Sequence, residues 1–169
     1  MILRNPGTLE RSGQRLFFHS NRALREEPLY AILCSRACPG AKIIEAFDLA
    51  QQWRVENRSV ISDFHTPVER ECLRIFLRGP QHLVLCPARG LDPFQLPNEW
   101  QKKYELAEML IVSPFDSSIR RPTRDTAEVR TRLVLDLATK RTIIYGSPGG
   151  LLDKLSKGAS REPIGPGHK

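Results

Sequence analysis

Short apolar runs alternate with longer amphipathic stretches along the middle of this chain. The runs are rich in Val, Ile and Leu, and they cover residues 29–34, 59–62, 82–86, 109–112 and 141–145. Continuous apolar runs of this length are typical of strands that are buried on both faces of a parallel sheet. The stretches between them repeat apolar residues at helical spacing. The alternation predicts an α/β fold, a three-layer sandwich with a mainly parallel sheet of five or more strands.

Residues 59–79 show the alternation most clearly. A short β-branched run turns polar and then restarts with helical spacing. Thr66 suits a helix N-cap, Pro67 the first helical position and Glu69 the acid of a capping box. The loop lies at the carboxyl end of a strand, and the helix start offers free N–H groups and a positive dipole end. The stretch therefore predicts either an anion site or a well-capped structural helix.

Three segments of the chain differ in composition. Residues 1–28 are polar and rich in Arg, which predicts an N-terminal basic arm. Residues 29–157 hold the alternating pattern and form the expected α/β domain. Residues 158–169 are rich in Gly and Pro, which predicts a disordered tail.

Charge and hydropathy narrow the classes of location and partner. The 169 residues carry a formal net charge of +7, and 40% of them are hydrophobic, as in a soluble globular protein. No apolar run approaches the roughly 20 residues that span a bilayer, and no signal-peptide core is recognisable. We therefore expect a cytoplasmic protein with no membrane partner. The positive charge permits a polyanionic partner such as nucleic acid.

Common metal, cofactor and catalytic motifs are missing from the sequence. Cys34, Cys38, Cys72 and Cys86 have no CxxC spacing, so we expect neither a zinc site nor a disulfide framework. The patterns GxGxxG, GxxxxGK[ST], GxSxG and HExxH do not occur. We therefore predict no metal, no cofactor and no catalytic residues, and we favour a binding role over an enzymatic one.

The loops that follow the strands contain Ser, Gly and Arg. In a parallel sheet these loops meet at one edge, so their side chains are expected to lie close together. Such a set offers hydrogen-bond donors and positive charge with few carboxylates, which favours phosphate binding. The candidate residues from these loops are Ser35, Arg36, Ser62, His65, Arg89, Ser113, Ser147, Gly149 and Gly150.

Five motifs occur in an order that resembles one bacterial family. They are Cys-Ser-Arg at 34–36, Val-Ile-Ser-Asp-Phe-His-Thr-Pro at 60–67, Leu-Cys-Pro-Ala-Arg-Gly-Leu at 85–91, Ser-Pro-Phe with Arg-Arg at 113–121, and Pro-Gly-Gly at 148–150. The order is similar to that of the DNA-processing protein A (DprA/Smf) family, nearest to its short members, over residues 29–152. The resemblance implies a Rossmann-like fold of the superfamily that DprA/Smf shares with LOG-type nucleotide hydrolases (SLOG).

The resemblance also implies a function. It points to a nucleotide or single-stranded nucleic-acid site at the strand ends, linked to DNA processing and recombination. Thr66 and the late-helix residues Arg130 and Arg132 join the candidate ligand-binding residues on this basis. Single-stranded DNA and a recombinase are the partners that the family implies, and a homo-oligomer stays open.

The chain departs from the family pattern at three positions. Asp63 stands where relatives have Gly, Thr131 stands where they have Asn, and Leu151 follows Pro-Gly-Gly where they have Lys-Thr-Glu or Gly-Thr. Two alternatives therefore stay beside nucleic-acid binding. One is a LOG-type nucleoside monophosphate phosphoribohydrolase that uses Glu128 and Arg132. The other is a protein-interaction module whose ligand site has decayed.

Overall fold

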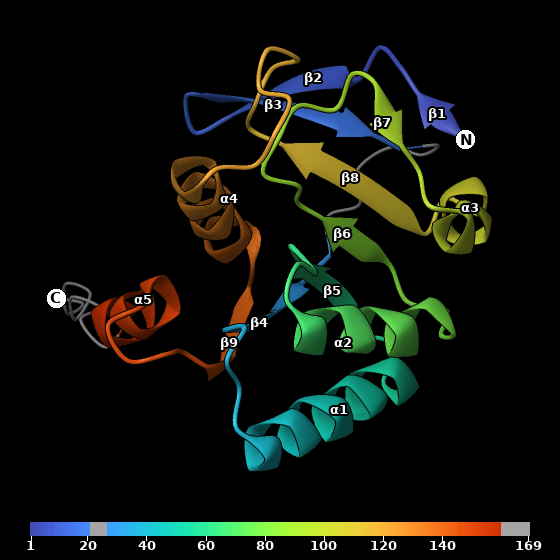
Figure 1. Cartoon of the computed structure of the whole chain (residues 1–169). Coiled ribbons are helices and arrows are strands. Elements are labelled where there is room, and N and C mark those ends of the chain that lie inside the picture. The colour runs from blue at the N-terminus through green and yellow to red at the C-terminus, as the bar shows by residue number, and fades with distance from the viewer. Residues whose placement is uncertain (21–26, 160–169) are drawn as a thin grey trace, which may run out of the picture.

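A seven-stranded sheet forms the centre of the molecule (Figure 1). The computed structural model describes residues 1–20 and 27–159. Along the sheet the strands follow the order β2-β3-β8-β6-β5-β4-β9. Their bounds are β2 Gly7–Arg11, β3 Gln14–His19, β4 Leu29–Cys34, β5 Ser59–Ser62, β6 Leu83–Leu85, β8 Met109–Ser113 and β9 Lys140–Tyr145. The strands from β8 to β9 in this order are parallel to one another, which confirms the predicted α/β fold.

Helices cover both faces of this sheet and complete the three layers. The first face carries α1 (Gly40–Val55), α2 (Pro67–Leu77) and α3 (Asn98–Glu105). The opposite face carries α4 (Arg124–Leu137), and α5 (Leu151–Ala159) packs next to the edge strand β9 (Figure 1). The arrangement is a Rossmann-like three-layer sandwich.

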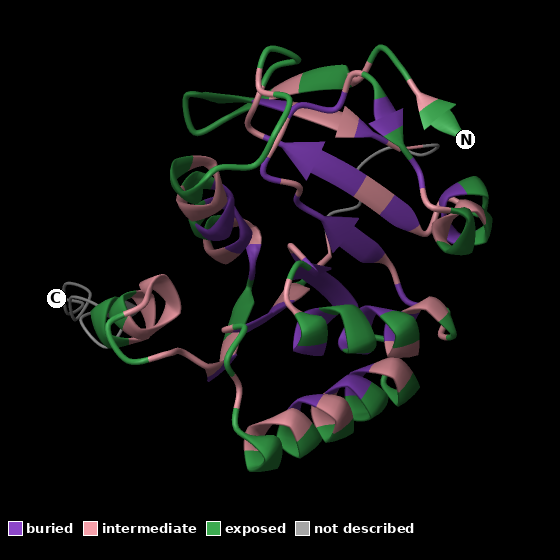
Figure 2. Ribbon diagram, in the orientation of Figure 1, coloured by how far each residue is buried: buried purple, intermediate pink, exposed green. Residues whose placement is uncertain are grey.

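Alternate residues of the same strands build the two cores. In β4, Ile32 and Cys34 belong to the core under α1 and α2, whereas Ala31 and Leu33 belong to the core under α4. Successive side chains of a strand point to opposite faces, so a strand covered on both sides needs apolar residues at every position. Figure 2 shows the central strands largely buried and the outer strand β2 largely exposed. The central strands therefore gave the strongest apolar runs.

Part of the segment expected as a basic arm over residues 1–28 forms two strands of the sheet, Gly7–Arg11 and Gln14–His19. β2 and β3 form an antiparallel hairpin, and β3 pairs antiparallel with β8. The two turn residues, Ser12 and Gly13, both have positive φ, as a tight hairpin turn requires. Leu16 is buried in the core under α4, whereas residues 11–15 around the turn are exposed. A hairpin with one polar face lacks the continuous apolar run that reveals a central strand.

Two further features lie near the chain ends. A second sheet pairs β1 (Ile2–Leu3) antiparallel with β7 (Phe94–Gln95). At the other end α5 continues to Ala159, into the segment expected as a disordered tail over 158–169. Residues 21–26 of the expected arm and 160–169 of the expected tail lie outside the described residues. Within the described ranges, no helix combines the length and the apolar character that crossing a membrane requires.

α2 begins as its sequence predicts. The Thr66 hydroxyl accepts the Glu69 N–H, and the Glu69 carboxylate accepts the Thr66 N–H, so both halves of a capping box are present. Pro67 occupies the first turn, and Val68 is buried below it. The cap fixes the loop at the carboxyl end of β5 and directs the Glu69 side chain back toward that loop.

Candidate functional site

The carboxyl ends of β4, β5 and β9 border a cavity of about 390 Å³. Residues of α4 and of the start of α5 line its other sides. Parallel strands bring their carboxyl ends to one edge, so loops that are distant in sequence meet there. Of the candidate residues, the cavity is lined by Ser35, Arg36, His65, Thr66, Arg130 and Ser147.

Glu69 occupies the start of α2, where the sequence predicted either an anion site or a well-capped structural helix. Its carboxylate accepts the backbone N–H groups of Cys34 at 2.8 Å, His65 at 3.0 Å and Thr66 at 3.1 Å. The side chain is 2% exposed and also lines the cavity. At this helix start the His65 and Thr66 N–H groups are therefore bound to a carboxyl group of the chain itself, and the Glu69 N–H is bound to the Thr66 hydroxyl.

Asp63 and Arg130 form a buried ion pair at the same cavity. The Asp63 Oδ2 and Arg130 Nη2 atoms are 2.8 Å apart, and the two side chains are 6% and 8% exposed. Asp63 Oδ1 also accepts the His65 N–H at 3.3 Å. Within the described residues, the buried Arg130 Nε has no hydrogen-bond partner. The pair neutralises Arg130, one of the cations that the sequence offered for phosphate.

The ionisable groups of the cavity are shifted by burial and by each other. Burial and the neighbouring Asp63 carboxylate raise the pKa of Glu69 well above its ordinary value, although backbone N–H groups oppose the shift. Burial, followed by the Arg130 charge, lowers the pKa of His65. Burial also raises the pKa of the Cys34 thiol, and it raises the pKa of Cys72 to about 12. These thiols stay protonated at neutral pH and behave as core residues rather than nucleophiles.

Three of the candidate serines hold the strand ends together. Ser62 Oγ donates to the Ile32 carbonyl at 2.7 Å, and Ser113 Oγ donates to the Arg89 carbonyl at 2.7 Å. Both serines are fully buried. The third, Ser35, accepts the Ser147 N–H at 2.9 Å and links the loops after β4 and β9. Their hydroxyls bind backbone atoms of the chain, which gives them a structural role.

The glycines before α5 are also engaged internally. The Gly149 N–H donates to Asp153 Oδ2 at 3.0 Å, and the Gly150 N–H donates to the Ser147 carbonyl at 2.8 Å. Gly149 has a φ of +74°, a conformation that side-chain-bearing residues rarely adopt. Neither glycine lines the strand-end cavity.

A second cavity of about 280 Å³ adjoins the first. Asp63, His65 and Arg130 line both cavities, so they form the wall between them. Arg89 lines the second cavity, and its guanidinium lies 5.0 Å from the centre of the Phe94 ring. Sequence analysis named Asp63 only as a departure from the family pattern and Glu69 only as a capping acid, and the structure places both at the first cavity. It missed Arg70, Phe94 and Trp100, which line the second cavity and which no motif links.

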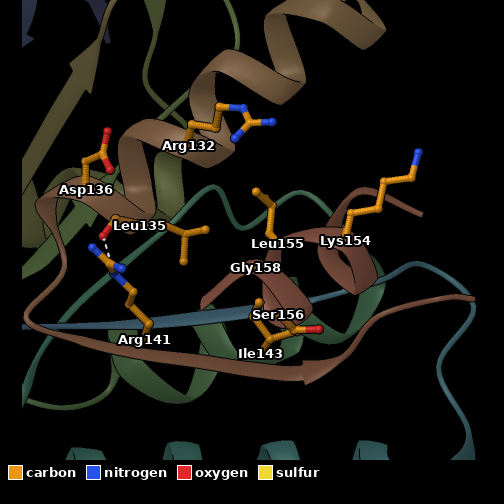
Figure 3. Close-up of a pocket in the computed structure, with 9 residues that line it drawn as sticks. All are labelled: Arg132, Leu135, Asp136, Arg141, Ile143, Lys154, Leu155, Ser156 and Gly158. Atoms are coloured by element: carbon orange, nitrogen blue, oxygen red, sulfur yellow. Dashed lines mark hydrogen bonds between the residues drawn. The ribbon is translucent and has the colours of Figure 1, made fainter. Parts of the chain in front are cut away.

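Arg132 lies apart from the other candidates. It lines a cavity of about 740 Å³ between α4, β9 and α5, together with Arg141 and Lys154 (Figure 3). Its guanidinium pairs with Glu128 at 2.9 Å, and the two side chains are 55% and 46% exposed. Arg130 precedes the buried Leu133 and Val134 by three and four residues, so it shares their face, whereas Arg132 does not. That spacing was the signal in the sequence that separates the two arginines.

The fold and the strand-end cavities define a Rossmann-like α/β protein with a candidate ligand site at the carboxyl ends of its parallel strands. More particularly, the chain has the fold of DNA processing protein A, as its motifs indicated. One similar structure is that of DNA processing protein A from Helicobacter pylori, which is described together with its single-stranded DNA binding mode. It matches with a TM-score of 0.63 at 19% identity. The match covers 83% of this chain and 69% of that one.

The Streptococcus pneumoniae protein of the same name has a similar relation to this chain. Its structure matches with a TM-score of 0.67 at 16% identity over 88% of this chain. This chain spans only 53% of the length of the S. pneumoniae chain. No family model matches the sequence, and no curated protein matches it either. The relation is therefore one of fold.

Proposed function

We propose that this chain binds single-stranded nucleic acid along the edge of the sheet where the parallel strands end. The observation that carries the proposal is that the backbone donors at this edge are bound within the chain, whereas two arginine side chains line its cavities. Backbone N–H groups of the loops are accepted by the chain's own side chains. Arg36 and Arg89 instead line the two adjoining cavities, one on each side of the Asp63–Arg130 pair.

This arrangement of donors favours a polymer over a free nucleotide. Sites for free phosphate groups commonly use a cradle of backbone N–H groups at a helix start, and here Glu69 occupies that cradle. Cationic side chains spread along a groove suit a chain of phosphates, because each contact displaces a counterion. Exposed arginines before and at the start of α4 extend the basic edge: Arg120, Arg121 and Arg124.

Two further facts support the proposal. The formal net charge of +7 favours a polyanionic partner. The fold is that of DNA processing protein A, and the H. pylori protein of that name is described as binding single-stranded DNA. We extend the proposal to a role in DNA processing, with a recombinase as a partner to be tested.

The hydrolase alternative has less support. It needs a carboxylate and an arginine held together over a ribose, and Glu128 and Arg132 were the pair expected to provide them. They form a solvated pair on α4, whose Arg132 lines the cavity beside α5, and neither residue lines the strand-end cavity. No observation at the strand ends favours glycosidic cleavage over binding.

The test measures binding of fluorescently labelled single-stranded DNA by anisotropy at several salt concentrations. We expect wild-type affinity to fall steeply with salt, and Arg36→Ala and Arg89→Ala each to flatten the slope by roughly 0.7 log units per log unit of salt. Arg132→Ala is the matched control, because it removes the same charge from a different cavity. Its slope is expected to stay at the wild-type value.

Two results would contradict the proposal. One is the absence of binding at low salt. The other is a set of slopes in which Arg36→Ala and Arg89→Ala equal wild type, or in which Arg132→Ala falls as far as they do. The protein-interaction alternative would then be preferred.

A further inference from the structure

The wall between the two strand-end cavities is an ion pair rather than an apolar partition. Asp63 Oδ2 and Arg130 Nη2 are 2.8 Å apart, and both side chains are almost entirely buried. The Arg130 Nε has no acceptor among the described residues. A guanidinium offers five N–H donors in a planar fork that matches carboxylate and phosphate oxygens equally well. Arg130 therefore keeps unused capacity for an anion while a carboxylate holds part of it.

A second acidic side chain, Glu69, lies beside the pair, and burial together with the Asp63 charge raises its pKa well above the ordinary value. The Glu69 carboxylate lines the same cavity as Asp63 and accepts three backbone N–H groups there. Arg36 Nη2 lies 3.5 Å from His65 Nε2 at the exposed side. An anion that passed Arg36 at the exposed side would meet the Asp63 carboxylate already bound to Arg130. Like charges at such distances in a buried place repel strongly.

We propose that Asp63 determines the specificity of this edge by acting as a resident anion at Arg130 that excludes small phosphates. Inorganic phosphate and the phosphate monoester of a free nucleotide carry about two negative charges near neutral pH and would have to enter the cavity. The phosphodiesters of a strand carry one charge each and can contact Arg36 and Arg89 at the rim. This inference rests on the proposed function and names the class of phosphate that the edge rejects.

Asp63→Asn tests the proposal most directly. The amide keeps the shape of the side chain and leaves the Arg130 charge uncompensated in a buried place, which a bound phosphate would neutralise. Calorimetric titration with inorganic phosphate and with AMP, at constant ionic strength, is expected to give at least roughly tenfold tighter binding than wild type. The double variant Asp63→Asn/Arg130→Gln is expected to lose this gain.

A matched control separates a local effect from one of net charge. Asp136→Asn changes the net charge by the same amount, but Asp136 is an exposed residue at the cavity beside α5. We expect it to bind phosphate and AMP no more tightly than wild type. Equal gains in Asp63→Asn and Asp136→Asn, or no gain in folded Asp63→Asn, would overturn the proposal.

A measurement on the wild-type protein decides the matter if Asp63→Asn does not fold. The Nε–Hε resonance of Arg130 is expected to stay in place during a titration with inorganic phosphate up to roughly 10 mM. A saturable shift of that resonance below this concentration would show that Asp63 does not exclude phosphate. The two proposals fail on different measurements. The phosphate titrations of Asp63→Asn test the exclusion of small phosphates, whereas anisotropy with single-stranded DNA tests binding of the strand.

Discussion

Arg130 and Arg132 leave the same helix two residues apart, yet they belong to opposite environments. Arg130 faces the sheet and forms a buried pair with Asp63 at the ends of the parallel strands. Arg132 faces the cavity beside α5 and pairs with Glu128 in solvent. In an α-helix, residues two positions apart are separated by about 200° around the axis. A short separation in sequence therefore places identical side chains on opposite sides.

The difference teaches which arginine is a fixed part of the fold and which is a free surface charge. A buried guanidinium that loses its partner carries a large desolvation cost, whereas an exposed one returns to water. The strand-end region is held by long-range contacts, since Asp63 and Arg130 come from different elements. The region beside α5 is held locally, since Glu128 and Arg132 are one helical turn apart.

The largest expected effect comes from removing each arginine in turn. Arg130→Met keeps an apolar stem but leaves the buried Asp63 carboxylate unpaired, which is expected to lower the free energy of unfolding by about 3–5 kcal/mol. The same change at Arg132 is expected to alter it by less than about 0.5 kcal/mol. Urea unfolding monitored by circular dichroism measures both. Losses of similar size in the two variants would mean that the buried pair contributes no more than the exposed one.

A smaller effect is expected from Glu69, and it depends on pH. The pKa of Glu69 in the fold is raised well above its ordinary value of 4.5, chiefly by burial and by Asp63. Its contribution to stability is therefore fully present below about pH 4.5 and is lost as pH rises through the folded pKa. Glu69→Gln removes this titration, so the variant should gain stability relative to wild type as pH rises.

Unfolding of the wild type and Glu69→Gln across the range from about pH 4.5 to about pH 8 tests this. At the acid end the two should differ by no more than about 1 kcal/mol, because the amide keeps a carbonyl oxygen for the backbone donors. His65 is present in both proteins, so its titration cancels in the difference to first order. A wild-type advantage that grows with pH would mean that the three N–H groups hold Glu69 ionised.

Much of the fold was predictable because the central strands are covered on both faces. The run Leu29–Cys34 and the cap at Thr66 were both predicted from local pattern, and the structure has both. The hairpin of β2 and β3 was not predicted, because many of its side chains are polar and exposed and only Leu16 and His19 are buried. The Ser12-Gly13 turn is the local sequence feature from which the hairpin could have been predicted.

The site was less predictable because it depends on how donors are shared between distant loops. Sequence analysis identified the strand-end loops and predicted either an anion site or a well-capped structural helix at the start of α2. It assigned Glu69 to the capping box but did not identify its further bond from the Cys34 N–H, because Cys34 lies on β4, far away in sequence. The partner of Arg130 is Asp63, on a strand-end loop far away in sequence. Pairings of this kind follow from the packed fold and leave no short-range pattern.

The smallest expected effect concerns Glu128, and it sharpens the comparison at the region beside α5. Glu128→Gln removes one negative charge next to Arg132 and leaves that guanidinium free in solvent. The change should alter the free energy of unfolding by less than about 0.5 kcal/mol, because exposed ion pairs contribute little.

Single-stranded DNA that follows the strand-end edge passes the Arg36 and Arg89 cavities and not the cavity beside α5, so the salt slope of binding by Glu128→Gln should stay at its wild-type value. If the strand instead ran beside α5, freeing Arg132 would steepen the slope by up to roughly 0.7 log units per log unit of salt. Anisotropy of Glu128→Gln beside Arg36→Ala therefore decides which of the two regions contacts the strand.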